Sequence, residues 1–188
     1  ACGNFFYGEG AGDSVADENF ETGGIRIYGA GHTVRDNYME GLTGTSWRRP
    51  ILIDSGDTSE STGNDSHETP TNIDIYNNMI IDSVGGGIYI GSDNYKNVPT
   101  DITIDGNIVI GNEATLFDNY ADKSSNIWSG NKAYATGSAI AVDGGALSAS
   151  EVEVLNSALP TSVEVLNSIL STSKPSFLTE SDVGPSAQ

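Results

Sequence analysis

Apolar and polar residues alternate in short runs along this chain, and glycine or polar residues bound each run. Alternation with a period of two predicts strands rather than helices. The clearest runs are Gly23–Gly29, His32–Met39, Ile51–Ile53, Ile73–Tyr76, Gly87–Gly91, Asp101–Asp105 and Asn126–Ser129. We therefore expect an all-β protein whose aliphatic side chains point to one face of each strand.

An asparagine recurs in five short stretches of the chain, with a small or polar residue before it and mostly apolar residues after it. The five are Asn4, Asn37, Asn78, Asn107 and Asn131, separated by 33, 41, 29 and 24 positions. Recurrence every 20–50 residues or so is typical of stacked repeats, in which neighbouring coils share one core. The pattern predicts a right-handed, single-stranded parallel β-helix, a solenoid of short strands.

These asparagines are interpreted as structural rather than catalytic. Asn tolerates the left-handed backbone that a sharp corner needs. Its amide can also hydrogen-bond to the same residue of the next coil, as the rungs of a ladder do.

Two regions follow from the repeats. Residues 1–145 are expected to form the coils, without the N-terminal coils of a full solenoid, because the chain opens inside a repeat unit at Gly3. Residues 146–188 are expected to form a C-terminal strand or cap segment. Here the stretch Glu151–Ser157 is echoed by Val163–Ser168, eleven residues later, and the pattern leaves helix and strand open.

The net charge of the chain limits the kinds of partner that it can bind. The chain carries 26 acidic and 8 basic residues, a formal net charge of −18. Such a surface repels nucleic acids and anionic membranes. No apolar run reaches the 18 residues of a membrane helix, and the single cysteine excludes an internal disulfide. We expect neither a nucleic-acid nor a membrane partner.

All four arginines fall within 24 consecutive residues, which is notable in so acidic a chain. They are Arg26, Arg35, Arg48 and Arg49. If isoleucines 25 and 27 fill the interior, alternation places Arg26 on the outer face of its strand, and Arg35 follows the same rule. Guanidinium groups hold carboxylates through bidentate hydrogen bonds.

Two interpretations of this arginine group stay open. In the first, Arg26 and Arg35 bind an anionic ligand, with Tyr28 and His32 as additional donors. In the second, the arginines only offset nearby acids, namely Asp36, Glu40 and Asp54.

The polar stretch Asp54–Pro70 is a second candidate, because its acids carry the oxygen ligands that Ca²⁺ prefers. Their spacing does not match an EF-hand loop, and a solvated loop is the favoured interpretation. We predict no metal site in this chain.

Three segments resemble polysaccharide lyase family 6, which contains the alginate lyases and chondroitinase B. The most specific segment is Gly23–Gly44, which contains Gly-Gly-Ile-Arg-Ile-Tyr-Gly and His-Thr-Val-Arg-Asp-Asn-Tyr. Gly3–Gly10 resembles the part just before it, and Leu178–Ser186 resembles the closing segment of the family.

The resemblance implies a secreted or periplasmic lyase that cleaves an acidic polysaccharide by β-elimination at 4-linked uronic acids. In that family a Lys acts as base, an Arg acts as acid and Ca²⁺ neutralises the uronate carboxylate. The catalytic pair and the Ca²⁺ ligands belong to segments expected upstream of Gly3, so no catalytic residue is assigned to this chain. What carries over is substrate contact, by Arg26 and then by His32.

We therefore expect the C-terminal part of an alginate lyase, inactive alone, whose N-terminal half is supplied by a second chain or has been removed. Dermatan sulfate is the less favoured substrate, because sulfate groups call for more basic residues than this chain has. The alternative is a non-catalytic β-helical module that binds acidic glycans or mediates assembly.

Overall fold

The computed structural model describes residues 4–7, 22–56, 67–91, 97–121, 125–143 and 147–155. These residues contain fifteen strands and one short 3-10 helix, η1 (Ser46–Arg48). The strands are β1 (Phe5–Tyr7), β2 (Ile25–Ile27), β3 (Thr33–Arg35), β4 (Tyr38–Glu40), β5 (Ile51–Ile53), β6 (Thr71–Tyr76), β7 (Met79–Ile81), β8 (Ile88–Ile90), β9 (Thr100–Asp105), β10 (Ile108–Gly111), β11 (Thr115–Asn119), β12 (Ile127–Ser129), β13 (Asn131–Ala135), β14 (Ile140–Asp143) and β15 (Val152–Val154).

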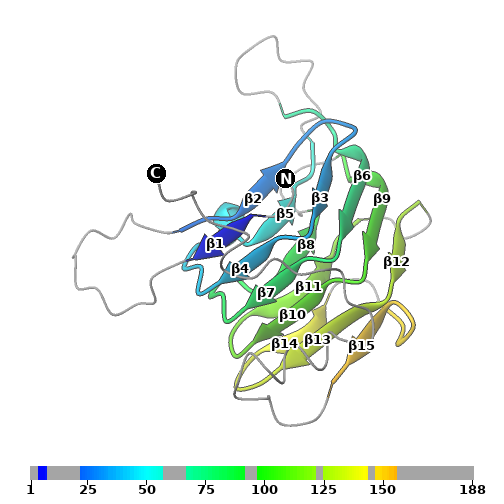
Figure 1. The fold of residues 1–188 in the computed structure, drawn as a ribbon. Helices are drawn as coiled ribbons and strands as arrows, with labels where there is room; N and C mark the ends of the chain where they lie inside the picture. The colour runs from blue at the N-terminus through cyan, green and yellow to red at the C-terminus, as the bar shows by residue number, and fades with distance from the viewer. Residues whose placement is uncertain are drawn as a thin grey trace.

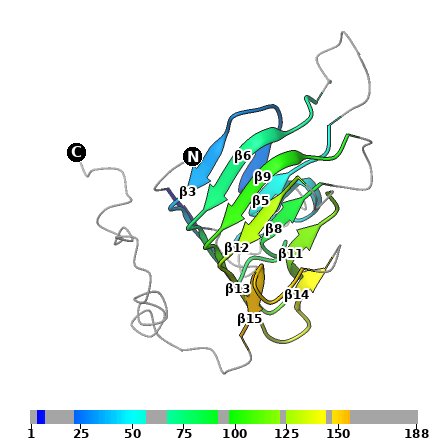
Figure 2. The same ribbon diagram turned by 90° about the vertical axis from the view of Figure 1, so that its right-hand side faces the viewer.

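The strands form three parallel sheets that run along one axis (Figures 1 and 2). The six-stranded sheet has the order β1-β4-β7-β10-β13-β15, the five-stranded sheet β14-β11-β8-β5-β2 and the four-stranded sheet β12-β9-β6-β3. Each full coil gives one strand to each sheet; β5, β6 and β7 form one such coil, and β8, β9 and β10 form the next. The predicted parallel β-helix is confirmed.

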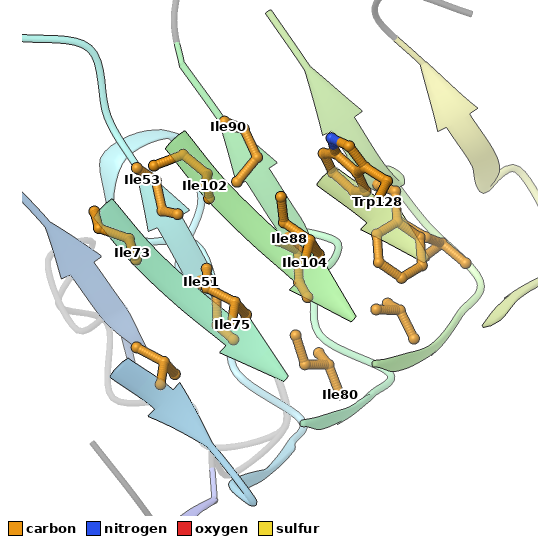
Figure 3. Close-up of a cluster of buried hydrophobic side chains, with 14 of the residues drawn as sticks. Ile51, Ile53, Ile73, Ile75, Ile80, Ile88, Ile90, Ile102, Ile104 and Trp128 are labelled. Carbon is orange, nitrogen blue, oxygen red and sulfur yellow. The ribbon is translucent and has the colours of Figure 1, made fainter. Parts of the chain in front are cut away.

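One continuous core fills the space between the sheets (Figure 3). The central strands send alternate side chains inward, where they stack on the equivalent residue of the next coil. Ile51 of β5 lies beside Ile88 of β8, and Ile75 of β6 lies beside Ile104 of β9. β-branched side chains suit this arrangement, because they pack well on a pleated, buried surface.

The predicted asparagine ladder is confirmed at the corner between the four- and six-stranded sheets. The Nδ2 of each asparagine donates to the Oδ1 of the next over 2.8–3.0 Å. Each backbone N–H before the last rung donates to the same Oδ1. The rungs are Asn4, Asn37, Asn78, Asn107 and Asn131, and all but Asn4 are buried.

The predicted reason for asparagine at this corner is wrong in one respect. The left-handed backbone belongs to the residue just before each rung, whose φ is 56° at Asp36, 54° at Asn77, 63° at Gly106 and 62° at Gly130. The corner therefore divides two tasks between neighbours. One residue bends the chain, and the asparagine that follows it bonds the coils together.

The strand predictions hold for the runs named from sequence, and five further strands were not assigned: β7, β10, β11, β13 and β14. Strand β15 settles the open choice of helix or strand for residues 152–154, which extend the six-stranded sheet beside β13. The echo at Val163–Ser168 lies outside the described residues, as do the segment Leu178–Ser186 and half of Gly3–Gly10. In the described part of the chain, no helix has the length and apolarity needed to cross a membrane.

Candidate functional site

The outer face of the five-stranded sheet carries a row of side chains that changes character from coil to coil. In register the row contains Arg26, Leu52, Tyr89, Asp118 and Asp143. The flanking positions on β2, β5 and β8 are isoleucines that face the core. Alternation thus places Arg26 outside, as predicted.

Two glycines let the strands of this sheet begin close to the next coil. A Cβ on Gly24 would lie 1.9 Å from the carbonyl oxygen of Pro50, and one on Gly87 would lie 2.2 Å from that of Leu116. The sequence echo between Gly24–Ile27 and Gly87–Ile90 thus reflects one packing need, at the start of β2 and at the start of β8.

Arg26 is held by a buried carboxylate. Its Nε and Nη2 donate to Oδ2 of Asp54 over 3.1 and 2.6 Å, and the Tyr28 hydroxyl donates to the same oxygen over 2.7 Å. The backbone N–H of Ser55 donates to Oδ1 of Asp54 over 2.9 Å. The Asp54 side chain is 4% exposed and that of Arg26 30%. Asp54 therefore fixes the guanidinium while leaving part of it in solvent.

Trp47 lies between two arginines. It belongs to η1, in the connection between β4 and β5, and its side chain is 50% exposed. The Cζ atoms of Arg26 and Arg48 lie 5.6 and 4.0 Å from the centre of a Trp47 ring. Cation–π contacts of this kind hold the indole and the guanidinium groups together at the surface.

Arg49 ties this connection to a more distant coil. Its Nε donates to the Ser46 carbonyl over 3.0 Å, and its Nη1 donates to that of Gly85 over 3.4 Å. Its Cζ lies 3.5 Å from the ring centre of Tyr89, whose hydroxyl donates to the Thr115 carbonyl over 2.9 Å. Burial raises the pKa of the Tyr89 phenol, and the charge of Arg49 opposes that rise. Tyr89 is thus a packed residue, as expected for Tyr on a β-surface.

Both histidines of the chain meet at Tyr28. A ring nitrogen of His32, Nε2, lies 2.9 Å from the Tyr28 carbonyl oxygen. The His67 ring stacks on the Tyr28 ring with a centroid distance of 4.2 Å. Of the four residues predicted to bind substrate, Arg26, Tyr28 and His32 are therefore brought together.

The fourth predicted residue, Arg35, lies elsewhere. It is on the outer face of β3 in the four-stranded sheet, where Nη1 forms an ion pair with Oδ2 of Asp36. The pairs Arg26–Asp54 and Arg35–Asp36 both support the interpretation that the arginines offset nearby acids. At Arg26 this pairing still leaves an exposed cation beside an exposed indole.

Sequence reasoning missed Trp47 and did not join Asp54 or His67 to Arg26 in one site. Asp54 was named there as an acid offset by the arginines, and Asp54 and His67 both belong to the calcium candidate stretch. The signal for Trp47 was its place next to Arg48 and Arg49 in a polar turn. The charge of Asp54 pointed to a pairing with an arginine, but which arginine it meets depends on the register of β2 against β5.

The described residues of the Asp54–Pro70 stretch do not form a set of ligands for calcium. Asp54 is engaged by Arg26, His67 stacks on Tyr28, and residues 57–66 lie outside the described part of the chain. Within the described residues, no group of three or more His, Cys, Asp or Glu side chains is arranged to hold a metal ion.

We call Arg26, Tyr28, Trp47, Arg48 and Arg49 the arginine–aromatic cluster. Its cations can bind an anion, and its exposed indole offers an apolar face to a flat ligand. In the comparisons with known proteins, no protein-family model matches the chain, and no curated protein matches it. The resemblance to polysaccharide lyase family 6 stays a prediction.

Proposed function

We propose that the arginine–aromatic cluster binds the carboxylates of an acidic polysaccharide, with alginate as the substrate of a family 6-like lyase to which this chain contributes. One observation carries the proposal. In a chain with a net charge of −18, Arg26 and Arg48 both lie against the exposed ring of Trp47, and Arg49, the next residue along, stacks on Tyr89. A uronic acid polymer offers the matching chemistry, a carboxylate on every apolar-faced sugar ring.

The geometry of Arg26 supports this role. A guanidinium carries five N–H donors in a fixed plane. Asp54 accepts hydrogen bonds from Nε and Nη2 of Arg26, and Nη1 of Arg26 makes no hydrogen bond within the described residues. Since the side chain is part-exposed, Nη1 can donate to a carboxylate that approaches from solvent, while Asp54 holds the plane of the group. Such pre-organisation lowers the entropy cost of binding.

Arg48 and Trp47 extend the same surface. Arg48 stacks on the indole at 4.0 Å, which orders its charge next to the ring that a sugar would cover. Arg49 fixes the connection that carries them, through its hydrogen bonds to the Ser46 and Gly85 carbonyls. A ligand here meets positive charge and an apolar ring together, and elsewhere it meets a strongly acidic chain.

In the lyase role, this cluster positions a uronate while the reaction proceeds on residues outside this chain. The proton at C5 is removed by a base, and the 4-linked oxygen leaves with help from an acid. Arginine is permanently protonated and cannot be that base. No step proposed here passes through Ca²⁺, because the described residues present no ligand set for it.

The rival function is a non-catalytic module that binds acidic glycans or mediates assembly. The observation in its favour is that the cluster consists of permanent cations and aromatic rings, which suit binding without proton transfer. Both functions require the same contact with a carboxylate, so binding is tested first and turnover second.

Binding is tested by titration calorimetry with alginate oligomers and with neutral mannan oligomers as the uncharged comparison. We expect binding of the acidic oligomers alone, weakened by salt. Arg48→Ala should reduce affinity about tenfold or more, since hydrogen bonds to charged groups are worth roughly 1.5–3 kcal/mol. Arg48 is preferred to Arg26 for this test, because removing Arg26 would leave the buried carboxylate of Asp54 without its ion-pair partner.

Arg35→Ala is the matched control, an arginine on another sheet with its own acidic partner. It should leave affinity unchanged. Equal losses from Arg35→Ala and Arg48→Ala would show that the charge of the whole face, rather than the cluster, attracts the ligand. Equal binding of neutral and acidic oligomers would overturn the proposal.

Turnover separates the two functions. The chain alone should release no unsaturated uronate, measured by ultraviolet absorbance. A second polypeptide that carries a Lys and an Arg on adjacent coils should restore release, and Arg48→Ala should then reduce it while the Arg26–Asp54 pair stays in place. Assembly by a non-catalytic module would tolerate Arg48→Ala.

A further inference from the structure

The middle of the outer face of the six-stranded sheet is apolar, and most side chains there are buried. Charged residues stand at the ends of its rows, Glu40 on β4 and Lys132 and Glu153 on β13 and β15. Rows on this face, opposite the core, contain Met79 and Ile108 in one register and Ile81, Ile110 and Tyr134 in the other. Met79 is 3% exposed and Tyr134 is 6% exposed. We define the outer apolar cluster as Met79, Ile81, Ile110 and Tyr134 with the partly buried Tyr38, Ile108 and Leu155.

This face differs from the outer face of the four-stranded sheet. There the rows contain Thr33, Asp74 and Thr103, which are exposed or half-buried, with the exposed Ile127 at the end. A parallel sheet with apolar side chains on both faces needs a second layer on each face. Left in water, an apolar patch of this kind is a site of association or aggregation.

The chain itself leads onto the cluster. After β15, the N–H of Leu155 donates to the Ala133 carbonyl over 2.9 Å, and its side chain packs with the cluster. Residues 156–188 follow. The sequence Glu-Val-Leu-Asn-Ser at residues 153–157 recurs at residues 164–168, so Leu166 occupies the place in its repeat that Leu155 has in the first.

We propose that residues 156–188 cover the outer face of the six-stranded sheet, with Leu166 packed on the outer apolar cluster as Leu155 is. The distance allows it. Four strand spacings separate β15 from β4, about 19 Å at the usual spacing, whereas eleven residues span up to about 36 Å. Leu166 can therefore reach any strand between them.

A second copy of the chain is the competing occupant. It would have to share the face with Leu155 and the segment that leaves from it. The segment is already tethered there, so its effective concentration at the face is in the millimolar range or above, and no encounter between molecules is required.

The test measures how fast a thiol reporter on this face reacts with a maleimide in the full chain. Cys2→Ser removes the native thiol, and Ile108→Cys places the reporter. Ile127→Cys, on the exposed outer face of the four-stranded sheet, is the reference. We expect the Ile108 reporter to react at least about tenfold more slowly than the reference, because reaction requires the cover to open.

Leu166→Asp is then added to each reporter, with Ser168→Asp as the control that adds the same charge two residues later. Leu166→Asp should raise the rate at the Ile108 reporter toward that of the reference, whereas Ser168→Asp should not. Circular dichroism checks that the sheets persist, and Tyr38→Cys serves as a second reporter if Ile108→Cys fails to fold.

Three outcomes would overturn the proposal. The first is a fast reaction at the Ile108 reporter in the parent, which would mean an open face. The second is a slow reaction that Leu166→Asp leaves unchanged. The third is protection that disappears on dilution together with a dimer in light scattering, which would assign the face to a second copy. None of these outcomes depends on glycan binding.

Discussion

The asparagine corner and the outer face of the five-stranded sheet are both rows of side chains in register from coil to coil. In the corner, all five rungs are the same residue, and four of them are buried. On the outer face the row contains four residue types: Arg26, Leu52, Tyr89 and the aspartates Asp118 and Asp143. The residue type is kept where its own amides bond one coil to the next. It changes along the outer face, where Arg26 and Asp143 are exposed and Leu52, Tyr89 and Asp118 are buried.

The reason lies in what each row must satisfy. A buried amide needs a partner for every polar atom, and stacked asparagines supply those partners to each other. A side chain on an outer face can use water or a neighbour from another loop, as Arg26 uses Asp54. Function can therefore change on the outer face without disturbing the solenoid.

The largest effect we predict breaks the ladder in its middle. Asn78 accepts from Asn37 and donates to Asn107 and to the Val34 carbonyl. Asn78→Ala leaves several of these buried groups without a partner, at roughly 1–3 kcal/mol each. We expect a loss of about 3–5 kcal/mol in the free energy of unfolding, measured by urea denaturation.

Asn4→Ala is the matched control, because it removes the same amide from the exposed end of the ladder. It should cost less than about 1 kcal/mol, the net worth of a typical hydrogen bond. Equal costs at Asn4 and Asn78 would mean that burial does not set the strength of the ladder.

Much of this corner was predictable from sequence, and one part was not. The repeat of asparagine gave the ladder, because only stacked coils bring residues 24 to 41 positions apart into contact. The left-handed residue was assigned to the asparagine itself. A small or polar residue precedes every rung, but Asp36, Asn77 and Gly106 differ in type, and the shared backbone conformation of these three residues is visible only in the structure.

A second prediction separates bending from bonding. Gly106 bends the chain before the Asn107 rung with φ at 63°. Gly106→Ala puts a Cβ into the left-handed region, at roughly 1–2 kcal/mol, and that Cβ would lie 2.8 Å from Oδ1 of Asn77. Asn77→Gly at the equivalent position of the preceding coil should be neutral or stabilising by a few tenths of a kcal/mol. Losses of equal size from both changes would contradict this division of tasks.

The arginine–aromatic cluster was predictable only in part. The outward position of Arg26 was predictable, because the alternation of inward and outward side chains along a strand can be recognised from adjacent residues in the sequence. Trp47 was missed, because an irregular connection brings it to Arg26. Asp54 was named only as one of several acids near the arginines, because its pairing with Arg26 depends on the register of β2 against β5. Arg35 obeys the same alternation as Arg26, yet it belongs to another sheet, since a corner separates β2 from β3.

The smallest predicted effect tests whether the outer face behaves as packed surface at Tyr89. Burial raises the pKa of this phenol above its ordinary value of 10.0. As pH rises past 10, the unfolded chain loses this proton before the folded chain does, so the unfolded state binds fewer protons and stability falls with pH. The contribution is fully present below pH 10 and is lost as pH rises through the folded pKa.

Tyr89→Phe should therefore lose less stability than the parent between pH 9 and pH 11 or so, measured by urea unfolding, after a constant offset for the lost hydrogen bond to Thr115. If the stabilities of the parent and of Tyr89→Phe fall in parallel over that pH range, the pKa of Tyr89 is the same in the folded and unfolded states. Burial of the Tyr89 ring would then not raise its pKa.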